Sequence, residues 1–344
     1  MIGTENEILK SVGQFIAKKC NNIVIMSHEN PDGDAVGSAV GLAEILQNNG
    51  HNVSIIFPND YPYFLKWFSS KIEILIYDNQ KKNIEEKMKK ADLLFCLDFN
   101  EVKRAGKLKK QLLEFSKPKI LIDHHLQPSL FCDYIISEPS YCSTAELIFD
   151  TVHKLNLASS INYNAAEALY TGILTDTGSF SHNISRANVF RVVSELLRYG
   201  INADKIHSNI YHNFSVERMK LLGYCLNEKM EILTELRTAV ISLTKEEQAK
   251  YNFQIGDYEG FVNYPLSIKN IVFSALFIEK EGLVKASFRS KGSFPSNKFS
   301  KDHFNGGGHL NAAGGESSES LDETLGNFKH LLMHYKHQLI NTKI

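Results

Sequence analysis

A short polar segment places a histidine and two aspartates within seven residues. These residues are His28, Asp32 and Asp34, and they follow the apolar run at 23–26 and precede a helical pattern. The segment is therefore expected to form the turn between a buried strand and a helix. Two carboxylates held close together repel, and one of them takes up a proton unless a cation lies between them. This spacing favours metal binding, although a helix N-cap followed by a turn residue has the same pattern.

Side chains that can bind metals recur where two other apolar runs end. Asp98 follows the run at 92–97, and three residues end the run at 119–122, namely Asp123, His124 and His125. In an open α/β sheet the carboxyl ends of parallel strands share one edge, where ligands bind. The coincidence of three such strand ends predicts a metal site at that edge. Asp176, in a glycine-flanked turn after an apolar helix, would be a further ligand, and an Asx-turn is the alternative.

The order of elements predicts an α/β protein with a doubly wound, mostly parallel sheet. A helix at 5–20 opens the chain, and further helices alternate with strands expected at 23–26, 51–57, 92–97 and 119–122. From Met230 a new strand-rich pattern predicts a second, smaller α/β domain with strands at 238–243, 271–277 and 283–289. We therefore divide the chain into a catalytic domain at 1–186, a helical linker at 187–226 and a second domain at 227–344.

Composition excludes several classes of protein. The chain has 344 residues and a net charge of −1, so it has no overall basic field to gather long nucleic acid. We find no apolar run of membrane-spanning length and no signal-peptide pattern. The five cysteines form no CxxC pair, which argues against disulfides and a thiolate zinc site and indicates a cytoplasmic location.

Three other polar features have ordinary explanations. The basic segment at 103–110 is interpreted as the exposed surface of a helix. Histidines 330, 334 and 337 fall opposite the apolar stripe of the last helix, so we expect them at the surface, and we make the same assumption for His51 and His207. The glycine-rich segment at 306–315 could form an anion-binding concavity or a flexible loop, and we expect it to open a helix.

Five motifs taken together resemble the DHH/DHHA1 phosphoesterase family. They occur in the family's order over nearly the whole chain: His28-x-x-Pro31-Asp32-Gly33-Asp34-Ala35-x-Gly37-Ser38, Asp98, Asp123-His124-His125, Thr175-Asp176-Thr177-Gly178-x-Phe180 and Gly306-Gly307-Gly308-His309-x-x-Ala312-Ala313-Gly314. The length of the chain is similar to that of the bacterial oligoribonuclease (nanoRNase) and pAp phosphatase branch, whose members are often described as exopolyphosphatase-related.

The resemblance implies two metal ions per site, usually Mn²⁺, with Mg²⁺ or Co²⁺ as alternatives. By position, the first ion would be bound by His28, Asp32 and Asp98, and the second by Asp34, Asp98, His124 and Asp176. Carboxylate and imidazole ligands suit these metals. Asp123 would orient His124, and His125 would contact the scissile phosphate or assist the leaving oxygen. In the second domain, the residues expected to hold another substrate phosphate or the terminal nucleotide are Arg289, Ser290, Gly307, Gly308 and His309.

The implied function is hydrolysis of short oligoribonucleotides to mononucleotides, and of 3′-phosphoadenosine 5′-phosphate (pAp) to AMP. We expect short RNA, dinucleotides and pAp as substrates, and neither long DNA nor a membrane as a partner; a homodimer is left open. Alternatives within the family are a linear or cyclic dinucleotide phosphodiesterase, a RecJ-like exonuclease, and a polyphosphatase or pyrophosphatase. An alternative without catalysis is a nucleotide-binding regulator.

Overall fold

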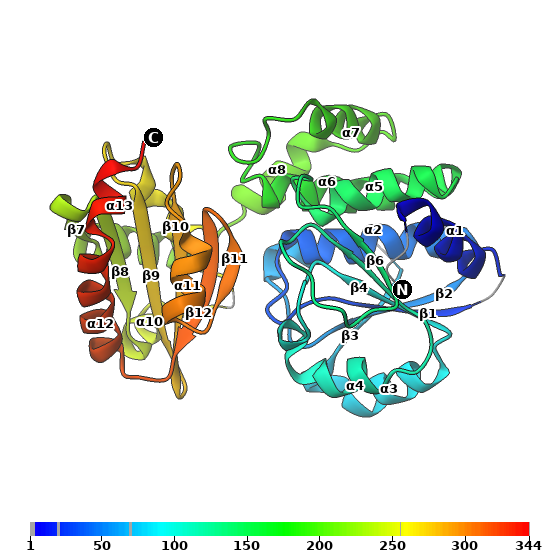
Figure 1. The fold of residues 1–344 in the computed structure, drawn as a ribbon, viewed down its shortest axis with the longest axis horizontal. Coiled ribbons are helices and arrows are strands. Elements are labelled where there is room, and N and C mark those ends of the chain that lie inside the picture. The colour runs from blue at the N-terminus through cyan, green and yellow to red at the C-terminus, as the bar shows by residue number, and fades with distance from the viewer. Residues whose placement is uncertain (1–3, 19–20, 69–70, 255, 344) are drawn as a thin grey trace. The chain divides into compact units, whose positions relative to one another are not determined.

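The chain forms two units, Met1–Asn213 (unit 1) and Phe214–Ile344 (unit 2) (Figure 1). The structure is a computed structural model that describes residues 4–18, 21–68, 71–254 and 256–343. Within the segment predicted as a linker, helices α7 (Ala187–Leu197) and α8 (Ala203–Tyr211) belong to unit 1, whereas α9 (Val216–Tyr224) belongs to unit 2. The three-part division made from the sequence stays a prediction.

Unit 1 is built on a six-stranded parallel sheet with the strand order β3-β2-β1-β4-β5-β6. The strands are β1 (Asn22–Met26), β2 (Asn52–Phe57), β3 (Glu73–Ile76), β4 (Leu93–Leu97), β5 (Lys119–Asp123) and β6 (Tyr134–Ser137). The order runs outward in both directions from β1 and β4, which confirms the predicted doubly wound α/β fold. The sequence did not predict β3 or β6, which are short strands at the two edges of the sheet.

Helices cover both faces of this sheet (Figure 1). They are α1 (Glu5–Ile16), α2 (Gly33–Asn48), α3 (Tyr77–Lys90), α4 (Lys109–Glu114), α5 (Thr144–Lys154) and α6 (Tyr163–Asp176), whereas α7 and α8 pack against α6. Side chains alternate along each strand, so Ile23 and Ile25 of β1 enter the core with α2, whereas Val24 and Met26 enter the core with α3. The opening helix was predicted to reach residue 20, and residues 19 and 20 lie outside the described residues.

Unit 2 contains a second six-stranded sheet with the order β11-β12-β10-β9-β8-β7. Its strands are β7 (Glu231–Leu233), β8 (Thr238–Leu243), β9 (Phe273–Lys280), β10 (Leu283–Ser290), β11 (Gly307–His309) and β12 (Ala312–Ser317). Its helices are α9, α10 (Lys245–Lys250), α11 (Ser296–His303), α12 (Leu321–His334) and α13 (Lys336–Asn341). Phenylalanine side chains of β9 and β10 pack with Phe299 of α11 and Phe328 of α12 to form the core of one face of this sheet.

The remaining turns of helix are short. They are η1 (Tyr63–Leu65), η2 (Val102–Leu108), η3 (Ala158–Ser160), η4 (Cys225–Lys229), η5 (Thr234–Leu236) and η6 (Phe261–Ser267).

The glycine-rich segment differs from its prediction. It forms the antiparallel pair β11–β12 rather than the start of a helix. Gly308 has a φ of 139°, and a Cβ at this position would collide with the carbonyl oxygen of Ala312. Only glycine therefore fits here, and it lets the two strands of the hairpin approach closely.

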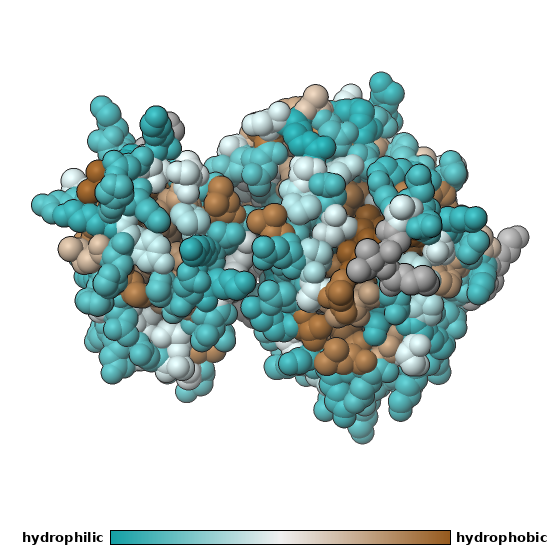
Figure 2. All heavy atoms as spheres, viewed as in Figure 1, coloured by the Kyte–Doolittle hydropathy of each residue, from teal (hydrophilic) through white to brown (hydrophobic). Residues whose placement is uncertain are grey.

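The predicted surface histidines do not all lie at the surface. Histidines 330, 334 and 337 are exposed, as expected, whereas His51 is only 3% exposed, because it follows α2 directly and packs at the start of β2. The face drawn in Figure 2 is dominated by hydrophilic residues. Among the described helices, none has the length and apolar character needed to span a membrane.

Helices α2 and α6 pack unusually closely at Gly37. A Cβ added to Gly37 would lie 2.5 Å from the carbonyl oxygen of Ala168 and 2.7 Å from the backbone nitrogen of Gly172. Both of these atoms belong to the backbone of α6, so they can move away only if the whole helix shifts. This contact holds the start of α2 against the end of α6.

We predict that Gly37→Ala lowers the free energy of unfolding of unit 1 by about 1–3 kcal/mol, because the added methyl group overpacks the contact. Gly13→Ala is the matched control: it lies within α1, and its Cβ would meet only Leu155 Cδ2, at 3.7 Å. This control should instead raise stability by about 0.5–1 kcal/mol. Urea unfolding followed by the fluorescence of Trp67, the single tryptophan, reports on unit 1. Wild-type stability in Gly37→Ala would contradict the packing described here.

Candidate metal centre

The predicted ligands of unit 1 meet at the carboxyl edge of its parallel sheet. His28 follows β1, Asp98 follows β4, Asp123 ends β5, and His124 and His125 come next. Two further carboxylates, Asp32 and Asp34, stand at the start of α2, and Asp176 is the last residue of α6. The sheet thus brings together residues that are up to about 150 positions apart in the sequence.

These residues form three groups in which the potential ligand atoms lie within 4.8 Å of one another. The groups are His28 with Asp32 and Asp98, Asp34 with His124 and Asp176, and Asp98 with Asp123 and His125. The first contains the three residues predicted to bind one ion, and the second contains those predicted to bind the other ion apart from Asp98.

The rings of His28 and His124 are oriented in the same way. In each, Nδ1 lies near a backbone carbonyl oxygen, that of Glu29 at 2.9 Å and that of Tyr141 at 3.3 Å. With Nδ1 as the donor, each neutral ring turns the lone pair of Nε2 into the site. A histidine that binds metal typically has its second nitrogen held in this way.

Both Nε2 atoms face carboxylate oxygens. His28 Nε2 lies 3.4 Å from Asp98 Oδ2 and 3.9 Å from Asp32 Oδ1. His124 Nε2 lies 3.7 Å from Asp98 Oδ1 and 3.6 Å from Asp176 Oδ2. Each oxygen of Asp98 therefore faces a different histidine. An imidazole lone pair and a carboxylate repel unless positive charge lies between them, so this donor set fits cations bound on both sides of Asp98.

The two alternatives that the sequence left open for Asp32 do not exclude each other. Its Oδ1 accepts hydrogen bonds from the backbone nitrogens of Asp34 and Ala35, so it is the N-cap of α2. The same oxygen faces His28 Nε2. Capping therefore does not exclude Asp32 as a ligand, because a carboxylate oxygen can accept more than one contact.

Asp34 is buried and receives hydrogen bonds from the start of α5. The backbone nitrogens of Thr144 and Ala145 donate to its two oxygens at 2.7 and 3.0 Å. Burial, followed by the charges of Asp98 and Asp176, raises the pKa of Asp34 well above its usual value. A cation in the site would oppose this effect, because it stabilises the ionised carboxylate.

The backbone of Asp98 turns its side chain into the site. Its φ is 64°, in the left-handed region that few residues other than glycine adopt. Thr144 Oγ donates to Asp98 Oδ1 at 2.8 Å. Burial opposes the ionisation of Asp98, but the surrounding histidines, His28 first among them, outweigh it and hold the pKa of Asp98 well below its usual value.

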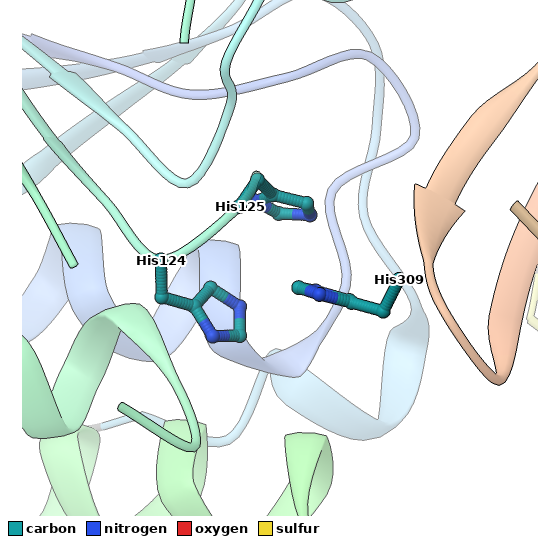
Figure 3. Close-up of side chains that lie close together, drawn as sticks. All are labelled: His124, His125 and His309. Carbon is teal, nitrogen blue, oxygen red and sulfur yellow. The ribbon is translucent and has the colours of Figure 1, made fainter. Parts of the chain in front are cut away.

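His125 belongs to a separate hydrogen-bonded chain. Its Nδ1 lies 2.7 Å from Asp123 Oδ1, and its Nε2 lies 2.9 Å from Arg104 Nη1. Since arginine only donates, Nε2 accepts from Arg104 and Nδ1 donates to Asp123. Burial, followed by the charge of Asp98, raises the pKa of Asp123 to about 7. Figure 3 shows the rings of His124 and His125, which stand nearly edge to face with their centroids 4.9 Å apart.

The hydrogen bonds around His125 differ from two interpretations made from the sequence. Asp123 was expected to orient His124, but the structure pairs it with His125 and places the Tyr141 carbonyl oxygen beside His124. Arg104 was assigned to an exposed basic helix, yet its guanidinium contacts His125. The reason is that Arg104 lies in η2, which follows β4 directly and so passes along the edge of the sheet where the site lies.

Sequence reasoning also missed residues that hold the site in place. Thr144 is the first residue of α5, and its backbone nitrogen and side chain contact Asp34 and Asp98. Beyond Asp176, Ser179 has a φ of 58°, and its Oγ lies 3.1 Å from Nε2 of His207, which we had placed at the surface. The only sequence signal for Thr144 was the helix-capping pattern at 143–146.

The predicted substrate residues of unit 2 lie on β10 and β11. Arg289 is half-buried on β10, and its Nη1 donates to the carbonyl oxygen of Phe288 at 2.9 Å. Ser290 is buried; its hydroxyl donates to the Phe294 carbonyl oxygen and accepts from the side chain of Asn311. In β11, Gly307 and Gly308 are exposed and His309 is half-buried.

Two family matches cover most of the chain. Residues 22–173 match the N-terminal domain of the DHH family, and residues 238–336 match the DHHA1 domain. The chain belongs to the DHH family. The first match contains every predicted metal ligand except Asp176, and the second contains all the predicted substrate residues.

Relatives and a solved structure extend this likeness to nearly the full chain. The bifunctional oligoribonuclease and PAP phosphatase NrnA of Thermus thermophilus is 26% identical over 90% of this chain and 88% of the relative. The protein of the same name from Bacillus subtilis is 25% identical over 93% of this chain and 95% of the relative. The crystal structure of an exopolyphosphatase-related protein from Bacteroides fragilis is 40% identical, with a TM-score of 0.91 over 98% of both chains.

We predict that Mn²⁺ stabilises unit 1 and that Asp98→Asn removes this stabilisation, because the variant loses the carboxylate that faces both histidines. Asp92→Asn is the matched control. Asp92 precedes the same strand at its other end, where it is paired with Lys117. At a free Mn²⁺ concentration 100 times the dissociation constant, the wild type should gain about 2.7 kcal/mol.

Urea unfolding of metal-stripped protein, with and without Mn²⁺ and followed by Trp67 fluorescence, measures this gain. The control should keep the full gain. An equal gain in Asp98→Asn would show that Mn²⁺ binds elsewhere.

Proposed function

We propose that this protein is a two-metal phosphoesterase that hydrolyses short oligoribonucleotides to mononucleotides and pAp to AMP. The observation that carries the proposal is the position of Asp98, whose two oxygens face the Nε2 atoms of His28 and His124. Full-length similarity to two relatives named as oligoribonucleases and PAP phosphatases supports the choice of substrates.

The residues that would hold the metals are the two ligand sets of unit 1. His28, Asp32 and Asp98 would bind one ion, and Asp34, Asp98, His124 and Asp176 would bind the other, with Asp98 shared. Oxygen and imidazole donors fit Mn²⁺, and Mg²⁺ or Co²⁺ as alternatives. When bound, such a pair of cations lowers the pKa of an attacking water and stabilises negative charge that develops around phosphorus.

The remaining residues of the edge would act on the substrate. Arg104 carries several N–H donors, of which one is bonded to His125 Nε2, so others can bind a phosphate oxygen. His125 would contact the scissile phosphate or assist the leaving oxygen. Asp123 holds the His125 proton at Nδ1 and thereby fixes the direction in which the ring acts. In unit 2, the predicted substrate residues on β10 and β11 would hold another substrate phosphate or the terminal nucleotide.

The proposal predicts a substrate order. The protein is stripped of metal, Mn²⁺ is restored, and hydrolysis is measured with pAp, dinucleotide RNA, longer RNA, single-stranded DNA, pyrophosphate and a cyclic dinucleotide. We expect the highest kcat/KM for pAp and the shortest RNA, because a net charge of −1 gives no overall basic field to gather a long strand. Parallel assays with Mg²⁺ and Co²⁺ identify the preferred metal.

Asp98→Asn should lose about a thousandfold or more in activity on every substrate, whereas Asp92→Asn should retain wild-type activity. Preference for pyrophosphate or long DNA would contradict the proposed substrates but not the metal centre. Absence of turnover on the whole panel would favour a nucleotide-binding regulator.

Arg289→Ala should raise KM for pAp and dinucleotide RNA by about tenfold and change kcat by less than about threefold, because it removes a phosphate-binding fork and none of the predicted metal ligands. Lys298→Ala, which removes an exposed positive charge from the same unit, is the control and should leave both constants unchanged. A loss confined to kcat would assign Arg289 to the chemical step instead of substrate binding.

A further inference from the structure

Two lysines of unit 2 converge on one tyrosine without a carboxylate partner. Lys285 Nζ lies 3.4 Å from the hydroxyl of Tyr258 and 5.5 Å from its ring centroid. Lys280 Nζ lies 5.2 Å from the same centroid and 4.5 Å from that of Phe253. The rings of Phe253 and Tyr258 are parallel to within 3° and stacked with their centroids 5.3 Å apart, so they form a rigid support. We call Lys280, Lys285 and Tyr258 the lysine–tyrosine cluster.

In the part of the chain that the structure describes, no carboxylate neutralises the positive charge of this cluster. Among the described residues, neither lysine forms an ion pair with a carboxylate. Nearby carboxylates have other partners: Glu247 binds Lys229, and Glu279 accepts from the backbone of Lys245. Burial, followed by the charge of Lys285, lowers the pKa of Lys280 to about 8. Two half-buried ammonium groups that repel each other in this way favour an anion.

The cluster continues the predicted substrate surface along one strand. Side chains of β10 alternate between buried and half-buried positions, so Lys285, Ser287 and Arg289 share the face that does not enter the aromatic core. Lys280, at the end of neighbouring β9, pairs with Leu283, two residues before Lys285. Lys285 and Arg289 are four residues apart, or about 13 Å along the strand. An extended single strand of nucleic acid covers this distance with a few nucleotides.

We propose that Lys280, Lys285 and the Tyr258 hydroxyl form a phosphate-binding site for a backbone phosphate of an oligoribonucleotide, beyond the phosphate assigned to Arg289. The inference rests on the proposed function and extends it, because the site would serve substrates of several nucleotides and leave dinucleotides and pAp out of reach. Two ammonium groups supply charge, and the tyrosine hydroxyl can donate a hydrogen bond while it accepts one from Lys285.

The test compares the full-length wild type with Lys280→Gln/Lys285→Gln. Binding of a fluorescein-labelled pentaribonucleotide is measured by anisotropy in EDTA, where no hydrolysis occurs, at several salt concentrations. We expect the double variant to bind at least about tenfold more weakly, and its slope of log K against log salt to fall in magnitude by about 0.7, because one phosphate of a single strand contributes about 0.7. With Mn²⁺ restored, kcat/KM for the pentanucleotide should fall, and kcat/KM for dinucleotide RNA should stay within twofold.

Two further variants separate charge from structure. Lys245→Gln/Lys329→Gln removes the same charge from unit 2 at lysines paired with Glu281 and Glu231, and it should bind like the wild type. Lys280→Arg/Lys285→Arg keeps the charge and should restore binding if the cluster holds a phosphate. A folded Lys280→Arg/Lys285→Arg variant that still binds the pentanucleotide weakly would overturn the inference.

The outcomes distinguish this inference from the proposed function. If the wild type hydrolyses dinucleotide RNA and the glutamine variant binds the pentanucleotide normally, only the phosphate site is wrong. An equal loss with dinucleotide and pentanucleotide would also overturn it, because the cluster would then act at the reaction site or on the fold. If the wild type hydrolyses no oligoribonucleotide, the proposed function fails, and the binding experiment in EDTA still decides whether the cluster binds phosphate.

Discussion

The carboxylate of Asp98 is buried between two imidazole rings, and each of its oxygens faces one of them. Backbone carbonyl oxygens lie beside Nδ1 of both rings, so that the Nε2 atoms point at negative charge. With Asp34 and Asp176 nearby, the site concentrates more carboxylates than an apolar surrounding tolerates without compensation. Positive charge between these groups relieves the repulsion, and this requirement explains the donor types, their burial and their orientation together.

The parallel sheet of unit 1 brings these carboxylates and imidazoles together at one edge. Its central strands β1, β4 and β5 end at the same edge, and each is followed by at least one ligand-type residue. The start of α5 donates two backbone hydrogen bonds to Asp34, so a helix N-terminus supports the anionic form of a carboxylate that burial disfavours. The close contact of α2 with α6 at Gly37 connects the segments that carry Asp34 and Asp176.

In unit 2, the alternation of side chains along β10 separates a buried aromatic face from a polar face. One face of β10 enters a core of phenylalanine rings, and the other carries Lys285, Ser287 and Arg289. The stacked rings of Phe253 and Tyr258 support the lysines at one end of this polar row. Because the aromatic core fixes the strand, the spacing of the polar side chains is set by the backbone itself, which suits recognition of regularly spaced phosphates.

The sequence by itself determined which residues could bind metals and at which strand ends they lie, because a polar residue directly after a buried apolar run is a local pattern. The alternation of strand and helix patterns along the chain likewise predicted a doubly wound α/β fold. Only the tertiary structure decided which groups meet: Asp123 with His125, Arg104 with His125, Thr144 with Asp98, and Ser179 with His207. It also decided that the glycine-rich segment pairs as a hairpin and that His51 is buried. These contacts join segments far apart in the chain, and their residue types serve equally well at a surface or a helix cap, so no local spacing could distinguish the alternatives.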